Sequence, residues 1–246
     1  MIFVRNFLFW ILASLATMVT GLTLCCLIPF PDAARFFVLK LWRNFCAALA
    51  RCLVGLKTEV RGRENIPASP TLVLAKHESA WETVGLQNLF IPAVFVLKKE
   101  LLKIPFFGWG LFALRMIAID RSAGRKALQQ LLEQGKERLK SGIWIIVFPE
   151  GTRVAPGEKM RYKSGAAYLA LKTGLPVVPV AHNAADYWPK KSFLIRPGTI
   201  TVSIGPAIPT VGKNDAEINA AVETWIENEM RVIAPRRYQA EVKPPL

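Results

Sequence analysis

An uncharged stretch near the beginning of the chain, from Phe7 to Ile28, most constrains what this sequence can fold into. It spans 22 residues, preceded by Arg5 and followed by Pro29 and Pro31. A helix rising about 1.5 Å per residue over this length covers about 33 Å, and a bilayer's hydrocarbon core is about 30 Å thick. A cleaved signal peptide is the alternative. However, its apolar part is usually about 7–15 residues long and ends in a small-residue cleavage site, which is missing here. The stretch predicts a retained membrane anchor.

The next segment, Arg35 to Leu56, has a helical pattern but carries basic residues. At about 100° per residue, four polar residues share an arc of about 100°, and apolar residues occupy the remainder. These four are Lys40, Arg43, Asn44 and Arg51. The pattern predicts an amphipathic helix lying in the membrane interface beside anionic headgroups, with a core-packing helix as the alternative. We therefore predict that residues 1–56 form a membrane-anchoring segment of two helices.

The charge of the chain indicates an anionic partner. Lysine and arginine number 32 against 18 acidic residues, which gives a formal net charge of +14. Such a balance suits an acidic lipid surface, an acidic carrier protein or a phosphorylated cofactor. Nucleic acid is disfavoured, because no zinc-finger spacing or RNA-binding signature occurs and the basic residues are scattered. The four cysteines lie in roughly the first fifth of the chain and show no disulfide framework, which predicts a reducing compartment.

From residue 57 onward the sequence alternates between strand and helix patterns, which predicts a single α/β domain over residues 57–246 with helices packed on a sheet. The predicted strands are Lys57–Val60, Thr71–Ala75, Ala93–Leu97, Met116–Ile119, Ile143–Phe148, Val177–Ala181 and Ile200–Ile204. The clearest helices between them are Ala123–Lys140 and Ser164–Thr173. A last helix is predicted from Asn214 to about Ile233, because Asn214 is a good N-cap and Glu217 follows three residues later.

One of only two histidines, His77, stands at the end of the apolar strand Thr71–Ala75. An imidazole, with an ordinary pKa of about 6.5, can accept and return a proton near neutral pH. Glu82 follows five positions later, about 140° away on a continuous helix. Contact between the two therefore requires His77 to precede the helix, with Glu82 reaching back from an early turn. A histidine at a strand end beside a surface glutamate is the alternative interpretation.

Cationic residues follow two other predicted strands. The segment Phe148–Arg153 turns sharply after an apolar strand and presents a glutamate and an arginine, and Arg121 follows Met116–Ile119. Sites in open α/β sheets gather beyond the carboxyl ends of strands, and arginine is a natural phosphate ligand. Lys163 adds a third positive charge. A solvated surface cation is the alternative for each residue alone, but together they predict an anion site near His77.

Together these residues resemble the 1-acylglycerol-3-phosphate acyltransferase family of glycerolipid acyltransferases, over roughly residues 66–180. The segments that carry the resemblance are His77–Glu82, Lys98–Leu101, Ile104–Trp109, Asp120-Arg121, Phe148–Arg153 and Val178–Val180. Their order and spacing match, and the Phe-Pro-Glu-Gly-Thr-Arg string is highly specific beside the first block. One departure is that Glu82 stands where the family usually has aspartate, which loosens the assignment of the acyl acceptor.

The resemblance implies a mixed sheet flanked by helices and transfer of a fatty acyl group from an acyl thioester to the sn-2 hydroxyl of lysophosphatidic acid, giving phosphatidic acid. It implies that His77 is the general base, that Glu82 orients its ring, and that transfer is direct. Substrate-binding positions fall at Arg121, Glu150, Gly151, Thr152, Arg153 and Lys163. No cofactor or metal is expected, with acyl-coenzyme A (acyl-CoA) or acyl-carrier protein as co-substrate. The expected location is a bacterial inner membrane, with the domain on the cytoplasmic face.

Two classes of hydrolase fit the sequence less well. A zinc hydrolase would need a second histidine at position 81, which is Trp81, and His182 is predicted to be a polar loop residue. A serine hydrolase would need Ser79 or Ser164 as nucleophile, and neither lies in a Gly-x-Ser-x-Gly motif. An acyltransferase acting on another lysolipid and a noncatalytic lipid-binding membrane protein remain open.

Overall fold

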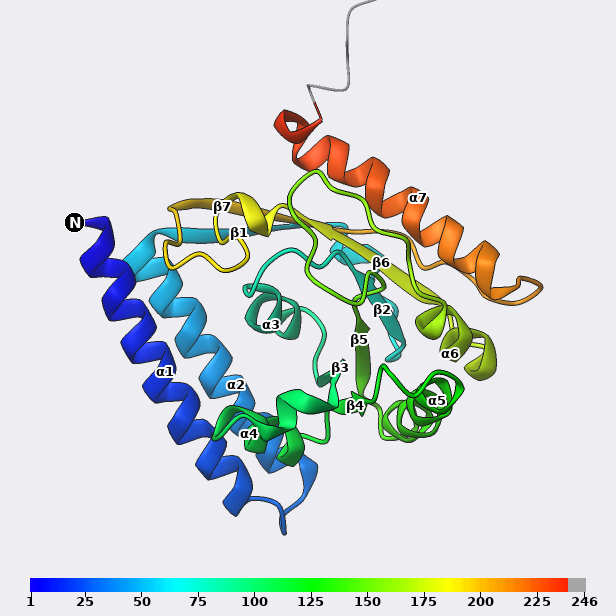
Figure 1. Cartoon of the computed structure of the whole chain (residues 1–246), viewed down its shortest axis with the longest axis horizontal. Helices are drawn as coiled ribbons and strands as arrows, with labels where there is room; N and C mark the ends of the chain where they lie inside the picture. The colour runs from blue at the N-terminus through cyan, green and yellow to red at the C-terminus, as the bar shows by residue number, and fades with distance from the viewer. Residues whose placement is uncertain (239–246) are drawn as a thin grey trace, which may run out of the picture.

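Seven strands form one sheet in the order β1-β7-β6-β2-β5-β3-β4 in the computed structural model, which describes residues 1–238 (Figure 1). Each predicted strand is present, with differences only at its ends. The strands are β1 (Leu56–Arg61), β2 (Leu72–Ala75), β3 (Ala93–Lys98), β4 (Ile117–Ile119), β5 (Trp144–Val147), β6 (Val177–His182) and β7 (Gly198–Ile204). The strands β2, β5 and β6 in the middle of the sheet are buried on both faces, as expected for short apolar runs in central strands, whereas the edge strand β1 is mostly exposed.

The pairing of the strands brings several chain segments to one edge of the sheet. β6, β2, β5, β3 and β4 run parallel to one another, whereas β6 pairs with β7 antiparallel, so the sheet is mixed as predicted. Parallel strands end at the same edge. Residues that follow β2, β4, β5 and β6 therefore lie along a single rim, where sites form in α/β sheets.

Helices cover the sheet on its two faces (Figure 1). They are α3 (Glu82–Gly85), α4 (Phe107–Ala113), α5 (Arg125–Lys140), α6 (Gly165–Thr173) and α7 (Asp215–Ile233). The predicted start of α7 is confirmed, since the Asn214 side chain accepts from the Glu217 N–H and the Glu217 side chain accepts from the Asn214 N–H. Ile218, Val222, Ile226 and Met230 form its buried stripe, with the three- to four-residue spacing of one helix face.

The N-terminal segment packs along the domain instead of standing apart from it. It contains α1 (Ile2–Cys26) and α2 (Asp32–Leu49), which continues into a π-helical turn at Ala50–Val54. Near the start of α1, Asn6 exchanges hydrogen bonds with the backbone of Ile195, at 2.8 and 3.1 Å. Near its end, Gly21 meets α4. One helix of residues 1–238, α1, is long and apolar enough to cross a membrane, and most of its side chains face outward.

The predicted polar arc of α2 is wrong at Arg43. Arg43 is 3% exposed and lies in the buried stripe with Leu39 and Cys46, whereas Phe37 and Phe45 are exposed. The helix buries two basic side chains, Arg35 and Arg43. Packing selects the face of the helix that meets the protein, and the angular distribution of charge does not specify that face. The predicted boundary between residues 56 and 57 falls at the beginning of β1, and the division into two units stays a prediction.

Close backbone contact between α1 and α4 depends on Gly21. A Cβ atom there would lie 2.2 Å from the Phe106 carbonyl oxygen, which is backbone and cannot rotate away. We expect Gly21→Ala to lower the melting temperature by about 2–10 °C, corresponding to about 1–3 kcal/mol of overpacking. Thermal unfolding in detergent measures this, with the outward-facing Leu15→Ala as control. Equal melting temperatures of Gly21→Ala and wild type would mean that α1 and α4 can move apart at little energetic cost.

Candidate active site

His77 and Glu82 contact each other through the geometry that their spacing requires. His77 follows β2, and Glu82 is the first residue of α3. Nδ1 of His77 contacts Oε2 of Glu82, while Oε1 of Glu82 accepts hydrogen bonds of 2.6 Å from the N–H groups of Glu78 and Ser79. The predicted contact is therefore present. The longer glutamate side chain reaches the ring and also the backbone of the turn between the two residues.

These hydrogen bonds define how protons are placed on the pair. Burial alone would raise the pKa of Glu82, but the rings of His77 and His182 and the Glu78 N–H hold it below its ordinary value. Glu82 is then a carboxylate that only accepts, so the Nδ1 atom of His77 carries the hydrogen. The Nε2 lone pair remains available to accept a proton. Phe148 stacks on the imidazole at 3.9 Å between ring centroids, which fixes the plane of the ring.

Three predicted substrate-binding residues meet at the turn after β5. Gly151 has φ +70°, and its carbonyl accepts a hydrogen bond from Arg121 Nη1. A Cβ at Gly151 would lie 3.0 Å from the Lys163 Nζ atom, so the missing side chain makes room for that lysine. These residues and Phe148 line a cavity of about 180 Å³ whose inner wall comes from α5. Two cations thus converge beside the stacked aromatic ring that supports His77.

The other residues of this turn take separate positions. Thr152 is exposed and Arg153 is half-buried, with its Nε atom lacking a hydrogen-bond partner among residues 1–238. The Arg153 carbonyl accepts from Lys190 Nζ at 2.7 Å. The next residue, Val154, donates its N–H to the His77 carbonyl at 2.8 Å. The turn is therefore tied directly to the backbone of the histidine.

Glu150 lies beneath the histidine loop and is fully buried. Its Oε1 atom accepts a long hydrogen bond of 3.4 Å from the His77 N–H and lies 3.6 Å from Lys76 Nζ. Burial raises the pKa of Glu150 to about 8, and the Lys76 ammonium opposes that shift. The carboxyl is therefore largely protonated at neutral pH. The side chain supports the histidine loop from below, and the assignment of Glu150 to the substrate-binding residues stays a prediction.

The protonation of Glu150 predicts a pH dependence of stability. Its folded-state pKa of about 8 is above the ordinary 4.5, so its contribution is complete below about pH 4.5 and is lost as pH rises through about 8. In that interval we expect the free energy of unfolding to fall by up to about 1.4 kcal/mol per pH unit. Glu150→Gln, which mimics the protonated form, should flatten this slope in melting curves between pH 5 and 8.5. The exposed Glu158→Gln is the control, and an unchanged slope in Glu150→Gln would contradict the assignment.

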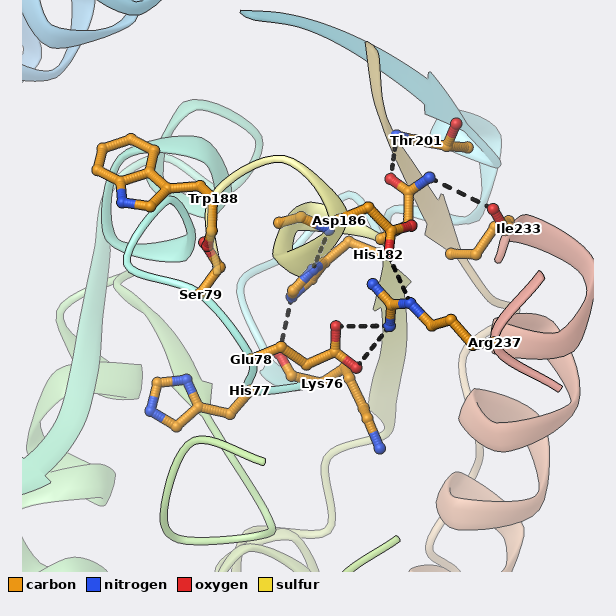
Figure 2. Close-up of polar contacts among 12 residues, drawn as sticks. Lys76, His77, Glu78, Ser79, His182, Asp186, Trp188, Thr201, Ile233 and Arg237 are labelled. Carbon is orange, nitrogen blue, oxygen red and sulfur yellow. Dashed lines mark hydrogen bonds and ion pairs between the residues drawn. The ribbon is translucent and has the colours of Figure 1, made fainter. Parts of the chain in front are cut away.

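The sequence did not identify a group of buried charged and polar residues around His77 (Figure 2). His182 ends β6 and is fully buried, so the prediction of a polar loop residue is wrong. Its Nδ1 atom accepts from the Ala184 N–H at 3.3 Å, and Nε2 donates to the Lys76 carbonyl at 2.8 Å. The same Nε2 is 3.4 Å from Glu82 Oε1. The sequence feature that could have indicated its burial is its position at the end of the apolar run Val177–Ala181.

An apolar cavity of about 60 Å³ lies where α1, α2 and α4 meet. Much of the segment Phe106–Leu114, which is rich in phenylalanine and leucine, lines it. Phe95 lines it as well and stacks on Phe148 at 5.7 Å, which in turn stacks on His77. A row of aromatic rings thus connects this cavity to the histidine. Within residues 1–238, no group of three or more His, Cys, Asp or Glu side chains could hold a metal ion.

Comparison with known proteins places this geometry among relatives. The model of the acyltransferase family matches residues 57–183. The chain is 46% identical over 237 residues, 94% of this chain and 92% of the relative, to 1-acyl-sn-glycerol-3-phosphate acyltransferase of Pseudomonas aeruginosa. It is 30% identical to 1-acyl-sn-glycerol-3-phosphate acyltransferase beta of Homo sapiens, over 69% of this chain and 62% of that protein. The crystal structure of the 1-acyl-sn-glycerophosphate (LPA) acyltransferase PlsC from Thermotoga maritima superposes with a TM-score of 0.77 at 27% identity, covering 95% of this chain and 99% of that one.

Proposed function

The chain belongs to the acyltransferase family, and we propose that its His77 and Glu82 catalyse acyl transfer to 1-acyl-sn-glycerol-3-phosphate. The reaction moves a fatty acyl group from an acyl thioester to the sn-2 hydroxyl, and the product is phosphatidic acid. The observation that carries the residue assignment is the His77–Glu82 pair at the same sheet edge as Arg121, Gly151 and Lys163.

The chemistry needs one base and one oriented nucleophile. The Nε2 atom of His77 accepts the proton of the sn-2 hydroxyl as the oxygen attacks the thioester carbonyl. Glu82 stabilises the imidazolium that forms, because its buried carboxylate faces Nδ1. Collapse of the tetrahedral intermediate forms the ester and breaks the carbon–sulfur bond. The thiolate then takes the proton back from His77, so no acyl-enzyme is required.

Arg121 and Lys163 bind the phosphate of the acceptor, and Arg153 supplies a further charge from the same turn. A guanidinium offers planar paired donors and a lysine offers a compact charge, which together suit a phosphate monoester. Holding the phosphate fixes the position of the hydroxyl near His77, which lowers the entropic part of the barrier. The apolar cavity between α1, α2 and α4 accepts an acyl chain. The donor is acyl-CoA or acyl-carrier protein, and no cofactor is used.

Membrane attachment follows from the exposed apolar surface of the N-terminal helices. α1 contacts the domain near both ends, through Asn6 and Gly21, which supports a position along the domain and within one leaflet. Phe37, Leu41 and Phe45 of α2 extend the apolar surface. The excess of basic residues attracts anionic lipids. The four free cysteines suit a reducing compartment, which favours the cytoplasmic face of a bacterial inner membrane.

A panel of acceptors and donors tests this function. The purified chain in detergent micelles is offered lysophosphatidic acid, lysophosphatidylcholine and lysophosphatidylethanolamine, each with labelled palmitoyl-CoA or palmitoyl acyl-carrier protein. Phosphatidic acid should be the main product, and Arg121→Ala should raise the KM for lysophosphatidic acid with a smaller effect on kcat. A zwitterionic acceptor that outperforms lysophosphatidic acid would contradict the phosphate site. Binding of lysolipid without turnover by any donor would support the noncatalytic alternative.

A further inference from the structure

Both neighbours of His77 are charged, and both are buried. Lys76 is 1% exposed and Glu78 is fully buried. Each is held by a residue from the C-terminal part of the chain. Lys76 Nζ is 2.7 Å from Oε1 of Glu227 in α7. Arg237 Nη1 donates to both carboxylate oxygens of Glu78, at 2.8 and 3.0 Å (Figure 2). The backbone of the histidine is therefore anchored on either side.

Arg237 connects more than two segments. It lies in the short helical turn Pro235–Arg237 after α7, and its side chain is only 7% exposed. Its Nε atom donates to Asp186 Oδ1 at 2.7 Å, in the loop that follows β6 (Figure 2). One guanidinium thus joins the C-terminal turn, the loop after β6 and the histidine loop.

The position of Glu78 is transmitted to the reacting pair through the backbone. The Glu78 N–H donates to Glu82 Oε1 at 2.6 Å, and Glu82 Oε2 contacts the ring of His77. A shift of the Glu78 side chain would turn this N–H away from Glu82, and Glu82 would then move relative to the imidazole. A displacement of about 1 Å at such a distance from the chemistry is enough to lower a rate about 100-fold.

Stability alone does not explain the buried ion pair. Removing two charges from water is costly, and well-packed apolar residues of similar volume often stabilise a fold equally well or better. The presence of a buried ion pair has a better explanation where the pair holds the neighbouring residues in one particular arrangement. Here the pair lies next to the predicted base, and Arg237 lies 159 residues from its partner in the sequence.

We propose that Arg237 is a positioning residue for acyl transfer, acting through Glu78 on the His77–Glu82 pair. The proposal rests on the function assigned above to His77. It extends the machinery to the C-terminal turn, outside residues 57–183 that match the family. Arg237 touches neither substrate nor His77 in this role. Its effect should therefore appear in kcat, with little change in the KM values of the two substrates.

The test compares Arg237→Gln with Arg236→Gln. Arg236 is an exposed neighbour in the same turn, so its replacement removes one positive charge and leaves Arg237 in place. Both are assayed beside wild type and His77→Ala, at temperatures where circular dichroism shows each variant folded. We expect Arg237→Gln to lower kcat about 100-fold with KM values within about 3-fold of wild type, and Arg236→Gln to match wild type. A kcat for folded Arg237→Gln within about 3-fold of wild type would overturn the proposal. Activity in His77→Ala would instead overturn the function on which it rests.

A second pair of variants separates positioning from general stability. Glu78→Gln leaves Arg237 bound to Asp186 and should fold, yet it should also lower kcat because the neutral side chain holds the loop less firmly. The double variant Glu78→Gln/Arg237→Gln removes both buried charges and should recover at least about 10-fold in kcat over Arg237→Gln. If Arg237→Gln does not fold, Glu78→Gln decides alone, since wild-type kcat in that variant would contradict the proposal.

Discussion

Replacing His77 with alanine should abolish nearly all formation of phosphatidic acid, with kcat falling on the order of 10²–10⁴-fold. The physical reason is that the Nε2 atom, which the hydrogen bonds of the loop leave available, is the proposed base. The proposed phosphate ligands Arg121 and Lys163 are untouched by the change, so the KM for lysophosphatidic acid should stay within a few-fold. Steady-state transfer of labelled acyl groups in detergent micelles measures both constants.

The fold of this variant should survive, because the His77 side chain is partly exposed and its removal leaves neither backbone anchor broken. Circular dichroism and thermal unfolding check this directly. His182→Gln is a useful companion, since the second histidine holds the Lys76 carbonyl from below and should affect stability more than His77 does. A transfer rate in His77→Ala within about 10-fold of wild type would rule out the assigned base.

Replacing Glu82 with glutamine should lower kcat about as much as His77→Ala, and the two conservative variants of Glu82 should differ. In Glu82→Gln, the N–H groups of Glu78 and Ser79 require the amide oxygen at the Oε1 position. The amide NH₂ then faces Nδ1 of His77, which becomes an acceptor, and the hydrogen moves to Nε2. That is the wrong tautomer for a base, and we expect kcat to fall about 10³–10⁴-fold, by analogy with the same change in serine proteases.

Glu82→Asp keeps the charge but shortens the side chain by one methylene. Part of the activity should remain, because the carboxylate still favours the hydrogen on Nδ1 even where one backbone hydrogen bond lengthens. We expect this variant to lie at least about 10-fold above Glu82→Gln in kcat. The exposed Glu64→Gln serves as a matched control for loss of one negative charge. Equal activity of the glutamine and aspartate variants would mean that the charge of Glu82 does not orient His77.

Local sequence was sufficient for the elements of the fold and for the reacting pair. The central strands β2, β3, β5 and β6 are short runs of mostly apolar residues. The start of α7 is marked by Asn214, with Glu217 three residues later. His77 and Glu82 are five residues apart, so strand end, turn and first helical turn alone bring them together. The prediction that cations would gather near them needed only the rule that parallel strands end at one edge.

Contacts between distant segments were decided by the tertiary structure. Periodicity describes which face of an element is apolar, but it does not say which neighbour covers that face. Arg43 of α2 is therefore buried although its place in a polar arc indicated exposure. Glu150 is buried because the histidine loop closes over the turn after β5, and this burial raises its pKa. No neighbouring residue in the sequence specifies that burial.

The sequence by itself determined the seven strands, the capped last helix and the contact between His77 and Glu82, the proposed base and its carboxylate. These depend on interactions within a few residues, whose energies are set by local geometry. Only the tertiary structure decided that Lys76 pairs with Glu227, 151 residues away, and that Arg237 holds Glu78, 159 residues away. Many acidic side chains could satisfy a lysine or an arginine in isolation. The partner is selected by the order of strands in the sheet and by the buried stripe of α7, which bring these particular groups together out of water.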